Sequence, residues 1–321
     1  MKPTSQAVES VSGVKYISPI EWTNATWNPV RGCSIVSKGC TNCYAMRQAH
    51  RQSGPGRAYE GLTQKSKGGP VWTGQVRLVP ELLEAPLHWK RPRRIFVNSM
   101  SDLFHEALPD EAIDRVFAVM ALCPQHAFQC LTKRADRLMR YFTCWPERHE
   151  RIDNLIHELM ESGMDEFPRG RGFPRFCEDW PLPNVWLGVS VEDQKTSDER
   201  IPLLLQTPAA VRFVSYEPAL GPVNFEQFPL KTLDGGENPG IDWLICGGES
   251  GPGARPFEVA WARNTIQQCK AAGVACFVKQ LGARPFYHDA ASHTWELMLK
   301  DSKGGDMAEW PEDLRVREFP R

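Results

Sequence analysis

Short apolar runs alternate with segments of helical periodicity along most of the chain. The apolar runs lie at 20–23, 94–98, 126–131, 184–190, 210–215, 241–246 and 274–278. Helical patterns occupy 79–89, 109–122, a stretch from Ala135, a stretch ending near Leu205, and 257–272, where Gly273 supplies a helix stop. Continuous apolar strands alternating with helices indicate parallel strands buried on both faces. The pattern predicts an α/β fold.

Polar side chains follow nearly every predicted strand, and they decide between two architectures. In a (β/α) barrel the site is built from the carboxyl ends of many strands, whereas a doubly wound sheet gathers its ligands at one switch point. Because many strand ends contribute here, we expect a full or partial parallel (β/α) barrel. The strand-end residues are Asn98, Ser99, Asp102, Thr132, Lys133, Ser190, Glu192, Glu217, Glu249, Lys279 and Gln280.

The alternation stops in three places, which suggest the domain boundaries. Residues 1–16 are polar and are expected to form a disordered leader before a barrel at 17–283. Residues 144–183 form an insertion, with a charged amphipathic helix at 147–162 and a Pro/Gly/Arg segment at 167–175. Either a lid or a tolerated surface excursion fits this insertion. Residues 284–321 are expected to be an extension that packs on the barrel.

Composition narrows the class of protein. The 321 residues are 41% hydrophobic and 24% charged, with a net charge of −1, as in an ordinary globular protein. Neither a membrane span nor an apolar signal segment is visible, so we expect a cytoplasmic protein. Ten cysteines in such a chain do not predict disulfides. Five of them lie in apolar surroundings and are expected in the core: Cys123, Cys130, Cys246, Cys269 and Cys276.

Three other cysteines form the candidate site. Cys33, Cys40 and Cys43 are spaced Cys-x6-Cys-x2-Cys in a polar loop between the first predicted strand and a helix that opens near Asn42. Closely spaced thiolates hold metals. A structural zinc site usually has four protein ligands, and His50 or His105 could supply the fourth. A 4Fe–4S cluster held by three thiolates would instead leave one iron open to a ligand.

This layout resembles the radical SAM superfamily, although that superfamily usually has three residues in the first gap. More closely, it is similar to an uncharacterised three-cysteine family met in phages and prophages. The resemblance covers about residues 20–283 and the Lys303-Gly-Gly-Asp306 tail. It rests on Trp27-Asn-Pro-Val-Arg-Gly-Cys33, Gly39-Cys-Thr-Asn-Cys-Tyr-Ala45, Asn98-Ser-Met-Ser-Asp-Leu-Phe104, Trp186-Leu-Gly-Val-Ser190, Glu217-Pro-Ala-Leu-Gly-Pro222, Gly247-Gly-Glu-Ser-Gly-Pro-Gly-Ala-Arg-Pro256 and Val278-Lys-Gln280.

The resemblance implies a function and roles for individual residues. Such enzymes bind S-adenosylmethionine (SAM) at the open iron and use an electron from a donor to cleave it to a deoxyadenosyl radical. Cys33, Cys40 and Cys43 would hold the cluster. By position, Asn98, Ser99 and Asp102 would accept the SAM amino group, and Ser190, Glu192 and Glu217 would make other cofactor contacts. Gly247 and Gly248 would bring backbone close to adenine or substrate. The catalytic candidates are Glu249, Lys279 and Lys133, with Arg255 as a further anion-binding group.

Two other readings stay open. The chain could be a zinc-stapled nucleic-acid-binding or structural protein, or a barrel whose cluster is only structural. A nucleotide or nucleic acid also stays open as the substrate. The chain has a basic turn at Lys90–Arg94 and arginines at 169, 171 and 175.

Overall fold

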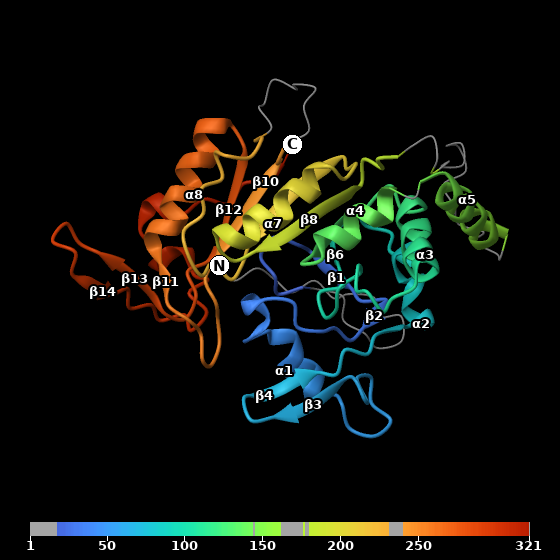
Figure 1. The fold of residues 1–321 in the computed structure, drawn as a ribbon, viewed down its shortest axis with the longest axis horizontal. Coiled ribbons are helices and arrows are strands. Elements are labelled where there is room, and N and C mark those ends of the chain that lie inside the picture. The colour runs from blue at the N-terminus through green and yellow to red at the C-terminus, as the bar shows by residue number, and fades with distance from the viewer. Residues whose placement is uncertain (1–17, 144, 162–175, 177–179, 231–239, 321) are drawn as a thin grey trace.

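Seven parallel strands form the central sheet of the computed structural model, which describes residues 18–143, 145–161, 176, 180–230 and 240–320. The strands follow one another in sequence order across the sheet, so each new strand is added at the same edge (Figure 1). They are β1 (Ala25–Trp27), β6 (Arg94–Val97), β7 (Ala127–Thr132), β8 (Val185–Val191), β9 (Val211–Tyr216), β10 (Trp243–Gly247) and β12 (Ala275–Gln280).

This strand order confirms a partial parallel (β/α) barrel. A doubly wound sheet would reverse direction at a switch point, and no reversal occurs among these seven strands. The sheet curls into a half-barrel whose edge strands, β1 and β12, are not paired with each other. The carboxyl ends of all seven strands therefore lie along one rim, as the sequence predicts.

Helices cover the outer face of the half-barrel (Figure 1). Helix α8 packs against β10 and β12, α7 packs against β8, and α3 packs against α5. Gly273 adopts a left-handed conformation, with φ of 66°, directly after α8, as predicted. The bounds are α3 (Asp110–Ala121), α4 (Ala135–Thr143), α5 (Trp145–Glu161), α7 (Gln194–Leu205) and α8 (Val259–Ala272).

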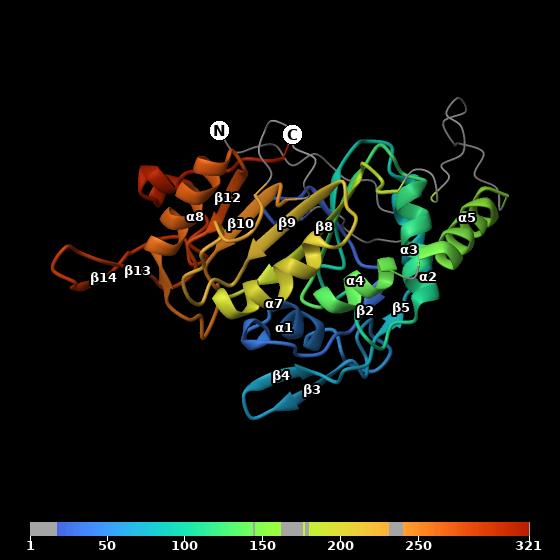
Figure 2. The same cartoon turned by 45° about the horizontal axis from the view of Figure 1, so that its top comes forward.

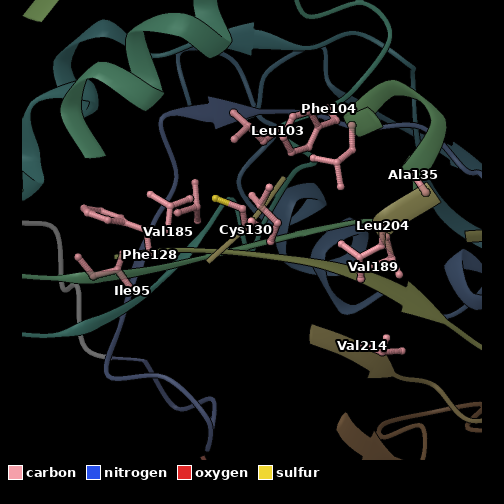
Figure 3. Packing of buried hydrophobic residues seen from close by; sticks show 14 of the residues in the cluster. Ile95, Leu103, Phe104, Phe128, Cys130, Ala135, Val185, Val189, Leu204 and Val214 are labelled. Carbon is pink, nitrogen blue, oxygen red and sulfur yellow. The ribbon is translucent and has the colours of Figure 1, made fainter. Parts of the chain in front are cut away.

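Both faces of the sheet are apolar, which explains the continuous apolar strands. On the outer face, Phe128, Cys130 and Val189 pack in the main core (Figure 3). On the inner face, Phe96, Phe213 and Trp243 form an aromatic cluster. The five cysteines predicted in apolar surroundings are free and buried, which confirms their place in the core.

Three sequence predictions fail at local detail. The first strand is Ala25–Trp27, not 20–23, because Trp22 points into the inner aromatic cluster before the strand begins. Outside the seven apolar runs, β3 (Thr63–Ser66) and β4 (Gly69–Trp72) form a hairpin that the sequence pattern did not predict. The helix predicted at 79–89 divides into α2 (Pro80–Leu83) and a 3-10 turn, η2 (Ala85–His88).

The hairpin packs beside α1 (Tyr44–His50), and together they project from the rim as a separate lobe (Figure 2). A short antiparallel pair ties the base of this lobe, joining β2 (Val30–Arg31) to β5 (Arg77–Leu78). Ala45, Met46, Tyr59 and Trp72 form its own small apolar core.

The C-terminal segment returns to the open side of the half-barrel. It contains β13 (Pro285–His288), β14 (Thr294–Glu296), η3 (Met307–Glu309) and η4 (Glu312–Leu314), and β13 pairs with β11 (Phe257–Glu258), which lies just before α8. Phe319 then lies 5.3 Å from both Trp243 and Phe277, ring centroid to ring centroid. The Arg94 guanidinium sits 3.9 Å from the centre of the same ring. The chain end thus fills the inner face where a closed barrel would place further strands. In the described part of the chain, no helix is long and apolar enough to cross a membrane.

Candidate functional site

A cavity of about 270 Å³ lies where the carboxyl ends of the strands meet the cysteine loop. Its apolar floor includes Trp22, Phe96 and Leu131, which belong to or pack against the inner aromatic cluster. All of the residues predicted at the strand ends except Glu192 line its wall, together with the three loop cysteines and Gly248. These are Cys33, Cys40, Cys43, Asn98, Ser99, Asp102, Thr132, Lys133, Ser190, Glu217, Gly248, Glu249, Lys279 and Gln280.

The cysteine loop places three free thiols on this wall. Cys43 is the residue from which α1 begins, as predicted. Burial raises the pKa of the Cys33 thiol to about 12 and also raises the pKa of Cys43. Both groups are therefore protonated at neutral pH in the metal-free protein. A bound metal would release these protons, since only the thiolate is a ligand.

The three thiols supply the sulfur donors that a metal centre takes. A structural zinc ion would need a fourth protein ligand, whereas a 4Fe–4S cluster binds each thiolate through a different iron. Among the described residues, no three His, Cys, Asp or Glu side chains converge on one ion position. His105 Nε2 bonds the Ser34 hydroxyl at 2.9 Å, and His50 Nδ1 bonds that of Thr63 at 3.0 Å.

Asn98 has a hydrogen-bond donor with no partner. Its side-chain oxygen accepts a bond from the Val30 amide at 3.2 Å, but its Nδ2 is buried and unbonded. The residue also has a φ of 60°, a left-handed conformation that asparagine tolerates and that occurs at functional sites. The Trp22 indole nitrogen is buried without a partner as well. Two buried donors on cavity-lining residues thus have no partner within the described ranges.

Asp102 and Ser99 are already engaged. Asp102 accepts bonds from the Thr132 hydroxyl at 2.7 Å and from Arg134 Nη1 at 2.9 Å, besides two backbone amides. The Ser99 hydroxyl donates to Asn28, and its carbonyl accepts the Tyr44 hydroxyl at 2.6 Å. Each oxygen of Asp102 already accepts two bonds, so Asp102 would have to exchange a partner to accept the SAM amino group. The Ser99 hydroxyl donates its bond and keeps lone pairs that can accept.

Each charged residue predicted as catalytic belongs to an ion pair. Lys133 contacts Glu192 at 2.7 Å and also bonds Ser190. Lys279 contacts Glu217 at 3.0 Å. Glu249 accepts two bonds from the Arg255 guanidinium, the shorter at 2.6 Å, and a third from the Arg255 backbone amide. Burial alone would raise the pKa of Glu192, but Lys133 and Arg200 outweigh it, and its pKa is lowered. Burial would raise the pKa of Glu249 too, but the hydrogen bonds from Arg255 lower it, so Glu192 and Glu249 both stay ionised at neutral pH.

Two of these pairs also fix the cysteine loop to the sheet. The Ser37 hydroxyl donates to Glu192 at 2.8 Å, and Asn42 Nδ2 donates to Glu249 at 2.9 Å. A Cβ at Gly39 would lie 2.3 Å from Glu192 Oε1, so only glycine allows this approach. Glu192 does not line the cavity, so it holds the cysteine loop from the side away from the cavity.

The glycines at 247 and 248 serve the packing of the protein itself. A Cβ at Gly248 would lie 2.4 Å from the Leu281 carbonyl, and one at Gly247 would lie 2.7 Å from Glu217 Oε1. Only Gly248 belongs to the cavity wall. The close approach of adenine or substrate to these glycines stays a prediction.

Arg134 is the main residue that sequence reasoning missed. Its side chain is 3% exposed and bonds Asp102, Glu106 at 2.8 Å and the Ser34 hydroxyl at 2.7 Å. Its Nη1 lies 3.8 Å from Cys33 Sγ. The signal available in the sequence was the position of Arg134, a second cation directly after Lys133 at a strand end. Of the insertion at 144–183, considered as a lid or a surface excursion, residues 144, 162–175 and 177–179 lie outside the described residues.

The fold and the cavity define a class of protein: a half-barrel of parallel strands whose site joins a three-thiol loop to polar strand ends. The chain belongs to a family of proteins of unknown function, DUF5131, whose model matches residues 17–305. Comparison with curated proteins found no match, and neither did comparison with solved structures.

Proposed function

We propose that this protein is an iron–sulfur enzyme of the radical SAM type. The observation that carries the proposal is the position of Cys33, Cys40 and Cys43, which line one cavity at the carboxyl rim of a (β/α) half-barrel. Three thiolates would leave one iron of a 4Fe–4S cluster open. When bound, such a cluster would supply the electron that cleaves SAM. The resemblance to a phage-associated relative of that superfamily belongs to the same proposal.

The chain's own residues would hold the loop and orient the ligand. Glu192 and Glu249 anchor the loop through Ser37 and Asn42, so the thiols face the cavity without rearrangement. Asn98 Nδ2 would donate to an oxygen of the ligand, a role opposite to the acceptor role that the sequence suggested. The Lys279–Glu217 pair is 21% and 14% exposed, and it would present both charges to the substrate.

The inner aromatic cluster would keep water from the floor of the cavity. Such exclusion protects reactive species and strengthens electrostatic interactions within the site. A separate one-electron donor and a reducing cytoplasmic compartment complete the proposal, because free thiols stay reduced there.

The test is anaerobic purification followed by reconstitution with iron and sulfide. We expect about four iron atoms per chain, as a 4Fe–4S cluster requires, and release of 5′-deoxyadenosine and methionine from SAM after reduction. Cys33→Ser, Cys40→Ser and Cys43→Ser should each lose iron. Cys123→Ala, which changes a buried core thiol, is the matched control and should retain it. One stoichiometric zinc in place of iron would refute the proposal, and iron without SAM cleavage would leave only a structural cluster.

SAM binding provides a second test that is independent of turnover. Asn98→Gly removes the unpaired Nδ2 and keeps a residue suited to the left-handed backbone. We expect SAM to bind about tenfold more weakly to the reconstituted variant, since a hydrogen bond to a charged group contributes about 1.5 kcal/mol or more. Equal affinity, measured by equilibrium dialysis, would remove Asn98 from the ligand site.

A further inference from the structure

The lobe beside the cavity carries a concentrated positive charge. We name residues 31–77 the basic lobe; they include the cysteine loop, α1 and the β3–β4 hairpin. This stretch contains eight Lys and Arg residues and one acidic residue, Glu60, so its net charge is +7. The whole chain carries −1, and the remainder therefore carries −8. The net charge of the whole chain is near zero, but positive charge is concentrated in the basic lobe and negative charge in the remainder.

Most of these cations are free to bind a partner. Six of them have exposed side chains, and none of the six forms an ion pair with any residue in the described ranges: Lys38, Arg51, Arg57, Lys65, Lys67 and Arg77. Like charges gathered in one small lobe repel one another. An anionic partner would relieve this repulsion.

The basic lobe also borders the cavity. Cys40, Tyr44 and Trp72 belong to the lobe and line the cavity wall. The Tyr44 side chain is 53% exposed, which leaves a ring face at the rim. Figures 1 and 2 show the lobe projecting from the half-barrel as a ridge of its own. A long polyanion bound along this ridge would pass the mouth of the cavity.

We infer that the basic lobe binds single-stranded nucleic acid and that one nucleotide of the strand enters the cavity as the substrate. This inference rests on the function proposed above. Cations on the lobe would contact successive phosphates, and the Tyr44 ring would stack on a base. A base inside a duplex cannot reach an enclosed site, so the strand must be single or the base extruded.

The character of the surface favours nucleic acid over an acidic protein. Protein–protein interfaces are depleted of lysine and of charge at their centre. Interfaces with nucleic acid are much more positively charged. The hairpin tip carries Lys65 and Lys67, both exposed, with no large apolar side chain between them. This arrangement suits a phosphate backbone.

The test is binding of fluorescein-labelled 20-nucleotide single-stranded DNA and RNA, followed by anisotropy between 50 and 200 mM salt. We expect binding that weakens steeply with salt. Lys65→Glu/Lys67→Glu changes two exposed residues of the hairpin and should weaken binding by at least about tenfold. Loss of two phosphate contacts should also reduce the salt slope by about 1.4. Lys270→Glu/Lys300→Glu, an equal change in charge on exposed residues outside the lobe, is the control and should bind as the wild type does.

Three results would overturn the inference. They are no binding of either oligonucleotide, equal binding by the lobe variant and the control, or equal competition by poly-glutamate of matched charge, which would indicate an acidic protein partner. Iron content and SAM cleavage of each variant separate this inference from the function on which it rests. Cleavage of SAM without oligonucleotide binding would refute the nucleic-acid substrate alone. Salt-dependent binding without a cluster would leave the binding surface and refute the enzyme.

Discussion

Replacement of Arg134 tests whether the cysteine loop is held by a buried ion pair. Arg134→Met keeps an unbranched apolar stem but leaves Asp102, 5% exposed, without its cation. Breaking a buried pair by removing one partner costs about 3–5 kcal/mol. Asp102 retains the Thr132 hydroxyl and two backbone amides as donors, which places the expected cost near the lower limit.

Other contacts of Arg134 add little to this value. Glu106 is 58% exposed, and surface pairs of this kind contribute between about 0 and 1 kcal/mol. Ser34 loses the guanidinium but keeps His105 at 2.9 Å. We therefore expect Arg134→Met to lower the free energy of unfolding by about 3 kcal/mol.

Urea unfolding followed by tryptophan fluorescence measures this loss. Arg140→Met is the control, because Arg140 and Asp136 form an i,i+4 pair with side chains 61% and 62% exposed. Its effect should stay within about 0.5 kcal/mol. Adding Asp102→Asn to Arg134→Met should cost less than the sum of the two single changes, since the unpaired charge is gone. If Arg134→Met unfolded like Arg140→Met, the buried pair would not hold the loop.

Three further changes test other parts of the structure. Gly188→Ala would place a Cβ 2.6 Å from the Phe213 ring inside the sheet, and should cost about 1–3 kcal/mol by thermal unfolding; an effect no larger than that of Gly68→Ala, at a position with open space, would contradict this packing. Glu192→Gln tests the lowered pKa of that carboxylate. Its ionised form stabilises the fold above its ordinary pKa of 4.5, and this contribution is lost as the pH falls through the lower folded value. The gap in stability between wild type and Glu192→Gln should therefore narrow toward pH 3, and a constant gap would exclude the linkage. Phe319→Ala removes a half-buried ring from Trp243, Phe277 and Arg94, and should cost about 2 kcal/mol in urea; unchanged stability would show that the chain end does not support the half-barrel.

The ion pairs of the cavity change the chemical role of its charged residues. Glu249 and Glu192 form ion pairs with cations and hydrogen-bond to the cysteine loop, so both residues have a structural role in holding that loop. The Lys279–Glu217 pair has no bond to that loop among the contacts described, and both side chains are partly exposed. Of the charges predicted to be catalytic, Lys279 is therefore the most accessible to a substrate.

Local patterns in the sequence were sufficient to predict that the strands alternate with helices and run parallel to one another. Apolar runs with period-two side chains on two buried faces, such as Ile95, Phe96 and Val97, can only be parallel strands under helices. Parallel strands share one direction, and their polar ends must therefore meet at one rim. For the same reason, the loop of Cys33, Cys40 and Cys43 could be placed at that rim from its position after the first strand.

Only the tertiary structure decided which of these groups are engaged and what closes the half-barrel. The pairing of Asn42 with Glu249 joins residues 207 positions apart, and no local pattern encodes such a contact. Phe319 fills the open side because the curvature of seven strands leaves an apolar face uncovered, a property of the whole sheet. The charge of the basic lobe was present in the sequence from the start. Its position beside the cavity depends on the packing of the β3–β4 hairpin against α1, which only the tertiary structure shows.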